Sequence, residues 1–283
     1  MIDSECITFL QWALPRLRLR WTGFRKVRRQ VCKRIRRRIG ELGLAGTAAY
    51  RDHLEHNPLE WSVLDRLCSI TISRFYRDRS VFDFLGHDVL SELARTAAAN
   101  GESVLHAWSI GCASGEEPYS LSLVWHFVVA PQVPGMEFRI LATDVDAEIL
   151  RRASHACYEA STLRLLPQGW MAQAFEPSAD GYCLRREYRE AVTLRRADIR
   201  TSSPEMSFHL ILCRNLVFTY FEDALQRETL SRILSGLRPG GVLVIGKTET
   251  LPAGFPALSA WAPNLGIYRR IACSADPEQR LSG

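Results

Sequence analysis

Four apolar segments of this chain each end in side chains that can bind or react. The segment 109–120, SIGCASGEEPYS, ends one apolar run in a glycine turn and follows it with two glutamates. Asp144 ends FRILATD, Asp198 follows AVTLRRA, and Asn215 follows LILCR. Ligands bind beyond the carboxyl ends of parallel strands in open α/β sheets. We therefore expect these side chains to line one binding site.

The acidic residues favour one adenosine cofactor over the others. An acid after the second strand suits the hydroxyls of a ribose, and an acceptor after the third suits an adenine amino group. A pyrophosphate at the helix start would meet Glu116 and Glu117, and like charges about 4 Å apart cost on the order of several kcal/mol there. S-adenosylmethionine has no phosphate, and its sulfonium and amino groups suit carboxylates. The sequence thus predicts S-adenosylmethionine rather than NAD or ATP, although the helix dipole also favours first-turn acids without any ligand.

Apolar periodicity predicts the elements that position these residues. From residue 4 to 68, apolar residues recur at spacings of three and four, which indicates helices. From about residue 104, short apolar segments alternate with helical ones, which indicates a parallel, doubly wound sheet. The predicted fold class is α/β, a Rossmann-like sheet with a small antiparallel β insertion and an all-helical N-terminal domain. We expect a helical recognition domain over 1–70, a linker and the start of the catalytic domain over 71–103, and a cofactor-binding domain over 104–283 with the insertion at about 158–190.

The basic charge of the chain is concentrated near its N-terminus. Residues 16–38 hold twelve Arg or Lys and no acid, so a net charge of +5 minus 12 leaves −7 for the rest. Such a block favours an acidic protein or peptide partner docking on a basic helix over 16–38. No apolar run is long enough to span a bilayer, and the order of charges near the start is the reverse of that in a signal peptide. We expect a cytoplasmic protein without membrane insertion.

The cysteines are scattered and contain no CxxC pair. This distribution predicts buried, reduced thiols rather than a disulfide framework, and no zinc site. The eight cysteines are Cys6, Cys32, Cys68, Cys112, Cys157, Cys183, Cys213 and Cys273.

Four segments together carry a family resemblance. SIGCASGEEPYSLSL, ATDVDAEIL, FHLILCRN…YF and the upstream TISRFYRD resemble the CheR-type methyltransferases. The resemblance covers nearly the whole chain. It implies an enzyme that uses S-adenosylmethionine to methylate glutamate side chains on chemotaxis receptors.

The resemblance also implies roles for individual residues. Arg77 and Tyr220 would be catalytic, and no metal is implied. The cofactor would be bound by Thr71, Ser73, Arg77, Gly111, Ala113, Glu117, Asp144, Asp198, Ile199, Asn215 and Leu216. The sequence departs from the family at Thr71, where an Asn is usual, at Arg74 beside Phe75, and at Tyr220, which follows Asn215 by five positions instead of four.

The favoured function is O-methylation of a protein carboxylate. Alternatives that keep the cofactor are methylation of a small-molecule acid, methylation of RNA, and binding of S-adenosylmethionine without catalysis. Nucleic acid is a less favoured partner, because few aromatic residues accompany the basic block and no Asn/Asp-Pro-Pro-Tyr motif follows the fourth strand.

Overall fold

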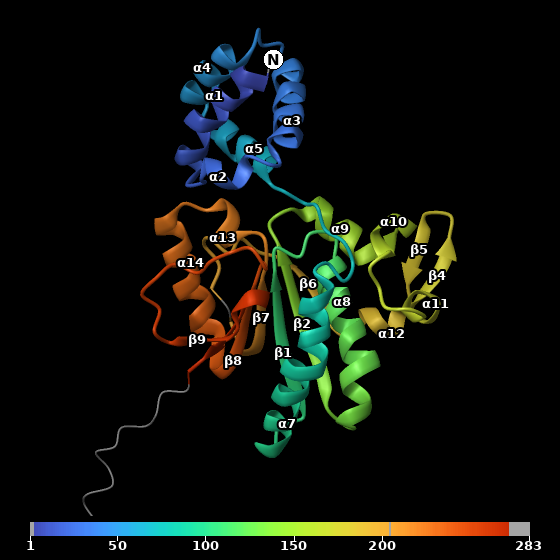
Figure 1. Cartoon of the computed structure of the whole chain (residues 1–283). Helices are drawn as coiled ribbons and strands as arrows, with labels where there is room; N and C mark the ends of the chain where they lie inside the picture. The colour runs from blue at the N-terminus through green and yellow to red at the C-terminus, as the bar shows by residue number, and fades with distance from the viewer. Residues whose placement is uncertain (1–2, 204, 272–283) are drawn as a thin grey trace, which may run out of the picture. The chain divides into compact units, whose positions relative to one another are not determined.

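The computed structural model describes residues 3–203 and 205–271 (Figure 1). The chain forms two compact units. The first contains Met1–Ile72 and Asn215–Arg227, and the second contains Ser73–Arg214 and Glu228–Gly283. The sequence-based division kept 215–227 with the sheet, whereas in the structure this segment belongs with the N-terminal helices.

The first unit is helical, as predicted for the N-terminal region. Its helix α3 illustrates why: Val31, Cys32, Ile35 and Ile39 are buried along one face, while basic residues fill the other. The elements are α1 (Asp3–Ala13), the 3₁₀ turn η1 (Leu14–Leu17), α2 (Trp21–Phe24), α3 (Arg28–Glu41), α4 (Thr47–His56), α5 (Pro58–Cys68) and α13 (Val217–Tyr220).

The second unit is built on a seven-stranded sheet with the order β6-β2-β1-β7-β8-β10-β9 (Figure 1). The first five strands in this order are parallel, and β10 pairs antiparallel with both of its neighbours, β8 and β9. The chain winds outward from β1 to β6 and returns to β7 beside β1, so the strand order reverses between β1 and β7. The strands are β1 (Val104–Ile110), β2 (Glu137–Asp144), β6 (Val192–Arg196), β7 (Phe208–Cys213), β8 (Leu237–Ile245), β9 (Leu258–Ala262) and β10 (Ile267–Arg270). This arrangement confirms the predicted Rossmann-like fold.

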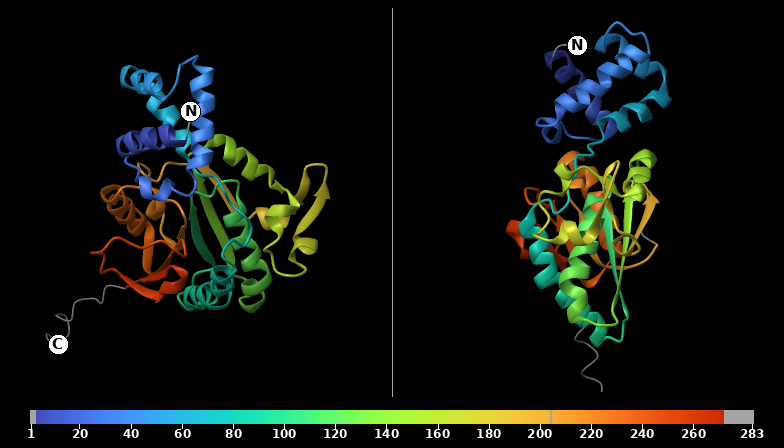
Figure 2. Two further views of the ribbon diagram at one scale, coloured as in Figure 1. Left: turned by 45° about the horizontal axis from the view of Figure 1, so that its top comes forward. Right: turned by 90° about the vertical axis from the view of Figure 1, so that its right-hand side faces the viewer.

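Helices pack against this sheet through an apolar core (Figure 2). Leu85, Leu121 and Val124 contribute from the helices, and Leu105 and Leu210 from the strands. The helical elements are α6 (Arg79–Phe84), the π-helical η2 (Leu85–Leu90), α7 (Ser91–Ala99), α8 (Glu116–Val124), the π-helical η3 (Trp125–Val129), the 3₁₀ turns η4 (Ala130–Gln132) and η5 (Pro263–Leu265), α9 (Ala147–His155) and α14 (Asp223–Gly236), which begins in the first unit. The sequence-based prediction missed β9, a short edge strand in which only Ala262 is buried.

The predicted small antiparallel insertion is present as a separate three-stranded sheet, β3-β5-β4. Its strands are β3 (Cys157–Tyr158), β4 (Phe175–Ser178) and β5 (Gly181–Leu184), accompanied by the short helices α10 (Ala160–Leu163), α11 (Trp170–Ala174) and α12 (Arg186–Arg189). Phe75 anchors it: its buried ring meets Tyr158 and Phe175 edge-on, with centroids 4.7 and 5.3 Å away. The TISRFYRD segment therefore holds the insertion through its phenylalanine.

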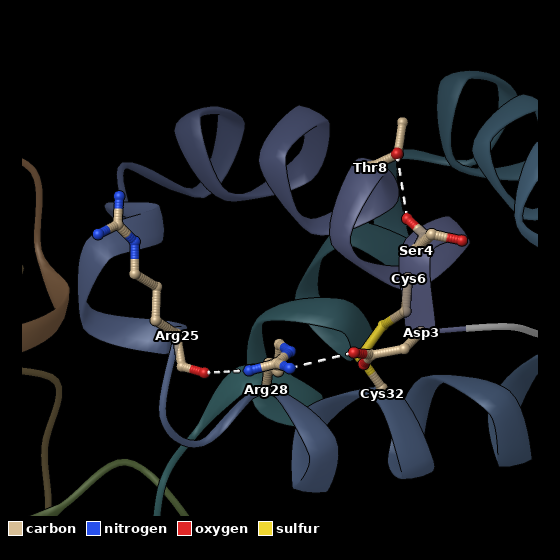
Figure 3. The surroundings of a disulfide bond; sticks show 7 residues. All are labelled: Asp3, Ser4, Cys6, Thr8, Arg25, Arg28 and Cys32. Atoms are coloured by element: carbon tan, nitrogen blue, oxygen red, sulfur yellow. Dashed lines mark hydrogen bonds and ion pairs between the residues drawn. A yellow bond between two sulfur atoms is a disulfide. The ribbon is translucent and has the colours of Figure 1, made fainter.

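The prediction of reduced cysteines is wrong for four of them. Cys6 in α1 is disulfide-bonded to Cys32 in α3, beside the ion pair of Asp3 and Arg28 (Figure 3). A second disulfide joins Cys157 and Cys183, which lie opposite each other in β3 and β5. Both pairs are 26 residues apart, and only the packing of helices and strands brings them together. Cys68, Cys112 and Cys213 are free and buried, as expected, and Cys273 lies outside the described residues.

Candidate functional site

A strained glycine turn leads from β1 into α8. Gly111, Ala113 and Gly115 all have positive φ, at 71°, 48° and 93°, a region where glycine costs little. The amide of Gly111 donates to the carbonyl of Thr143 over 2.8 Å, which ties this turn to the end of β2. At Gly115 a Cβ would lie 2.7 Å from the Tyr119 ring. Packing therefore requires this glycine whether or not a ligand is bound.

An arginine holds the second glutamate of the turn. Arg214, directly after β7, donates through Nη1 to Oε2 of Glu117 over 3.2 Å and through Nη2 to Oδ2 of Asp78 over 2.7 Å. Ser109 in β1 donates to the other oxygen of Glu117 over 2.8 Å. We call Asp78, Arg214 and Glu117 the arginine bridge. Because Ser109 and Leu212 are register partners, the bridge lies where the strand order reverses, the usual ligand position in such sheets.

The arginine and the glutamate of the bridge are largely removed from water, whereas the Asp78 side chain is 32% exposed. The side chain of Arg214 is 3% exposed and that of Glu117 is 14% exposed. Burial raises the pKa of Glu117, while the charge of Arg214, the hydroxyl of Ser109 and the charge of Arg77 act in the opposite direction. Removing one partner of a buried ion pair typically costs about 3–5 kcal/mol. The bridge is therefore a strong constraint on the position of the Glu117 carboxylate.

Glu116 is the more deeply buried of the two glutamates. It is 4% exposed, and its Oε1 accepts a 2.8 Å hydrogen bond from the hydroxyl of Ser114. Among the described residues its Oε2 has no hydrogen-bond partner. Burial raises the pKa of Glu116, and the hydroxyls of Ser114 and Ser73 oppose that shift. Ser73 of the linker segment therefore meets the first turn of α8.

Asp144 joins the ends of two strands. Its Oδ2 accepts from the amide of Ala113 over 3.0 Å and its Oδ1 from the amide of Asp146 over 3.1 Å. The carbonyl of Asp144 accepts from the amide of Ala197 over 3.0 Å, which brings in the end of β6. Burial raises the pKa of Asp144, and the amides that it accepts from lower it.

Asp198 is held by a neighbouring arginine. Arg200 donates through Nε and Nη2 to its carboxylate, at 3.0 and 2.8 Å to Oδ2. Burial alone would raise the pKa of Asp198, but the bonds from Arg200 lower it. An adenine amino group at Asp198 would share this carboxylate with Arg200. Ile199 is buried, and its carbonyl accepts from Arg232 over 2.9 Å.

The structure groups part of the predicted site and leaves part in the other unit. The residues collected around the carboxyl ends of β1, β2, β6 and β7 in the second unit are Ser73, Arg77, Gly111, Ala113, Glu117, Asp144, Asp198 and Ile199. Thr71, Asn215, Leu216 and Tyr220 belong to the first unit. Asn215 has a positive φ of 55° and Leu216 precedes α13. The roles of all these residues stay predictions.

Sequence reasoning missed Arg214 and Asp78 as site residues. Both stand inside quoted segments, in LILCRN and in FYRD, between residues that were assigned roles. A usable signal was present, because an arginine that directly follows a wholly buried strand requires acidic partners.

The residues of the second unit fit S-adenosylmethionine. The positively charged sulfonium and amino groups of this cofactor suit carboxylates, and the turn after β1 holds two, one with an unpartnered buried oxygen among the described residues. Glu117 would take the amino group, the turn with Gly111 would allow close backbone approach, and Asp144 would lie near the ribose. Among the described residues no group of three or more His, Cys, Asp or Glu is placed to hold a metal ion, and no helix is long and apolar enough to cross a membrane.

The chain is similar to known proteins in its sequence, through a family model and curated relatives. The family model "CheR methyltransferase, SAM binding domain" matches residues 71–260. The "Chemotaxis protein methyltransferase" of Listeria innocua is 34% identical over 199 residues, 70% of this chain and 72% of that protein. "Chemotaxis protein methyltransferase 1" of Pseudomonas aeruginosa is 28% identical over 78% of this chain and 81% of its own length. Among solved structures, the N-methyltransferase NodS of Bradyrhizobium japonicum with S-adenosyl-L-homocysteine covers 68% of this chain and 97% of its own, at 15% identity and a TM-score of 0.34.

Proposed function

We propose that this chain, which belongs to the CheR methyltransferase family, methylates a glutamate side chain on a chemotaxis-type receptor protein. The family assignment, the methyltransferase activity and the cofactor S-adenosylmethionine are as the sequence predicted. The receptor as acceptor is carried over from relatives whose names state chemotaxis protein methyltransferase. We place the reaction in the cytoplasm, on the same basis.

The observation that carries the proposal is the arginine bridge at the strand-order reversal. It fixes one buried carboxylate beside the glycine turn, where the amino group of the cofactor would be stabilised. The same bridge binds the linker segment, because Nη2 of Arg214 also donates to the carbonyl of Arg77 over 3.1 Å. Arg77 is therefore fixed through its backbone, and its guanidinium is close enough to Glu117 to lower the pKa of that group.

The chemistry requires little beyond alignment. When bound, the cofactor supplies the methyl group of its sulfonium. The acceptor oxygen would form a bond to this methyl carbon while the carbon–sulfur bond breaks and the sulfur keeps the electron pair. A glutamate acceptor has a pKa of about 4.3 and is already ionised at neutral pH, so no general base is needed. Arg77 would orient the acceptor carboxylate through its fork of N–H donors, and alignment of this kind contributes about 7 kcal/mol or more to catalysis. Tyr220 would lie near the acceptor, and Asn215 and Leu216 would close the cofactor pocket.

Only some of the basic residues in the basic segment, residues 16–38, are exposed to solvent, where an acidic partner would contact them. Several of its arginines are used inside the first unit: Arg38 pairs with buried Glu60 at 2.8 Å, and Arg34 donates to the carbonyls of Leu67 and Ser69. The basic residues exposed to solvent are Arg16, Arg18, Arg25, Lys26, Arg29, Lys33, Arg36 and Arg37. We call Arg29, Lys33, Arg36 and Arg37, which lie on α3, the exposed basic face; a receptor helix with acidic residues would dock there.

Labelled S-adenosylmethionine tests the acceptor class directly. The chain is incubated with labelled cofactor and a bacterial lysate, and the label is sorted by fraction and by stability in mild base. Base-labile label on protein is expected, since a carboxyl methyl ester hydrolyses readily. Base-stable label on RNA, or label only on small acids, would contradict the proposal.

A further inference from the structure

We infer that Arg20 is a positioning residue for methyl transfer: it holds the short helix α13 in the conformation that presents Tyr220. The inference rests on the proposed function, because Tyr220 is its predicted catalytic tyrosine. Residues 18–24 and 217–223 both belong to the first unit.

Helix α13 is too short to be stable without contacts from other segments. It runs for four residues, Val217–Tyr220, and the chain turns extended at Phe221, with φ −78° and ψ 150°. The last carbonyls of a helix have no partners inside it, and a single helical turn is unstable alone. The carbonyls of Phe218, Thr219 and Tyr220 therefore need donors from elsewhere.

Arg20 supplies donors to all three carbonyls. Its Nη2 donates to Phe218 and its Nε donates to Thr219 over 3.1 Å. Its backbone amide donates to the carbonyl of Tyr220 over 2.8 Å. A guanidinium presents its donors in a planar fork and can serve successive carbonyls at once, which the single ammonium of a lysine does less well. Its positive charge is also favourable at a helix C-terminus.

The residues on either side of Arg20 continue the contact. Leu19 and Phe221 form an antiparallel bridge. On the next residue pair, the amide of Glu222 donates to the carbonyl of Arg18 over 2.9 Å, and the Arg18 side chain donates to the Glu222 carboxylate over 2.7 Å. The segment 18–20 thus lies along 220–222 like an added strand.

The next turn of the chain packs on Tyr220 itself. A Cβ on Gly23 would lie 2.2 Å from the carbonyl oxygen of Thr219 and 3.1 Å from Cδ1 of Tyr220, so this close approach is open only to glycine. The ring of Phe24 lies 5.0 Å from the Tyr220 ring, tilted by 56°. The Arg20 backbone amide and the Phe24 ring thus contact Tyr220 itself, and the Arg20 side chain holds the two carbonyls that precede it.

Arg20 is therefore unlike the exposed arginines of the basic segment. Its side chain also lies 3.6 Å from the Asp223 carboxylate, and its guanidinium donates to carbonyls of α13, whereas the exposed basic face lies on α3. We expect it to act on the rate of methyl transfer through Tyr220 and not on cofactor affinity.

Steady-state kinetics of Arg20→Ala, Arg20→Lys, Tyr220→Phe and the double variant Arg20→Ala/Tyr220→Phe test this role. Arg20→Ala should lower kcat by about ten- to a hundredfold, since small misplacements in a site have effects of this size, while the affinity for S-adenosylhomocysteine stays unchanged. Arg20→Lys should recover part of the rate. If Arg20 acts through Tyr220, the double variant should be no slower than Tyr220→Phe. Arg66→Ala, an exposed arginine on α5 outside the basic segment, is the matched control.

Additive effects in the double variant, or an unchanged kcat in Arg20→Ala, would overturn the inference. Amide hydrogen exchange provides a readout that does not depend on activity: Arg20→Ala should raise exchange at Tyr220 and Phe221, whose amides donate to Leu216 and Val217, and leave α3 protected. If the wild-type chain methylates no carboxylate, the proposed function fails. Unchanged exchange at 220–221 in Arg20→Ala would defeat the positioning role by itself.

Discussion

Nη1 of Arg214 donates to the carboxylate of Glu117 over 3.2 Å, and this ion pair joins the end of β7 to the first turn of α8. Nη2 of the same guanidinium donates to Asp78, so one buried arginine connects the linker segment, the end of β7 and the first turn of α8. Its Nε has no hydrogen-bond partner among the described residues, and its guanidinium carbon lies 5.4 Å from the centre of the Phe82 ring. Arg214 and the hydroxyl of Ser109 together fix the position of the Glu117 carboxylate.

Replacing Arg214 by Met should destabilise the second unit. The change keeps an unbranched apolar side chain but leaves the carboxylates of Glu117 and Asp78 without their cation, which typically costs about 3–5 kcal/mol. Urea unfolding measures the loss. Adding Glu117→Gln should restore part of the lost stability, because one of the two uncompensated charges is then gone. A double variant less stable than Arg214→Met would contradict the ion-pair account.

Binding of S-adenosylhomocysteine should strengthen as pH rises through the pKa of Glu117. Burial raises this pKa above that of an ordinary glutamate, so the neutral form persists to higher pH, and only the ionised form attracts the amino group. Arg214 lowers the pKa of Glu117, so Arg214→Gln should move the rise in affinity to higher pH. Calorimetric titrations across a pH series follow both curves. An Arg214→Gln curve shifted to lower pH would refute the assigned charge interaction.

Gly23→Ala should impair catalysis and stability together. The new Cβ would overlap the carbonyl of Thr219 at 2.2 Å, which forces α2 and α13 apart. Gly40→Ala is the matched control: Gly40 lies in α3 with nothing within 4 Å of its Cβ position. In a helix interior this change typically adds about 0.5–1 kcal/mol of stability. Thermal unfolding of both variants should thus move in opposite directions, and equal shifts would disprove the close contact at Gly23.

Charge reversal on the exposed basic face should weaken docking of the receptor. Lys33→Glu adds repulsion toward an acidic partner, so we expect a higher KM for the receptor that is sensitive to ionic strength, with cofactor affinity unchanged. Arg66→Glu changes the charge by the same amount in the same unit and should have little effect. Identical KM values for wild type and Lys33→Glu at low salt would exclude this face as the docking surface.

Reduction should destabilise the first unit through loss of the Cys6–Cys32 bond. Closing a loop of this length is worth about 3 kcal/mol in the chain-entropy model. Alkylation of the unfolded, unreduced chain followed by peptide mass spectrometry tests the pairing first: peptides with Cys6 and Cys32 should stay unlabelled and linked. The Cys6→Ser/Cys32→Ser variant should then lose its response to reductant in this unit, and labelled Cys6 in the oxidised protein would contradict the pairing.

Local sequence patterns predicted the sheet and the acidic residues at its strand ends because these signals are contained in short segments. Gly111 follows an apolar strand, and Asp144 ends another, so periodicity alone indicates both positions. The packing of residues 18–24 against residues 217–223 could not be predicted in this way. Arg20 and Thr219 are 199 residues apart, and no sequence pattern in either segment indicates that it contacts the other. The Cys6–Cys32 pair was missed for the same reason, since two helices must pack before the sulfurs meet.

Mapping the methylated residue on a receptor tests the central claim most directly. The purified chain is mixed with S-adenosylmethionine and the signalling region of a chemotaxis receptor from the same organism, and the receptor peptides are sequenced by mass spectrometry. The account predicts a methyl ester on glutamate side chains that mild base removes, together with S-adenosylhomocysteine in equal amount. Neither product should form with the Glu117→Gln variant. A methyl group on nitrogen or on a nucleotide, or cofactor binding with no methyl transfer to the receptor, would contradict it.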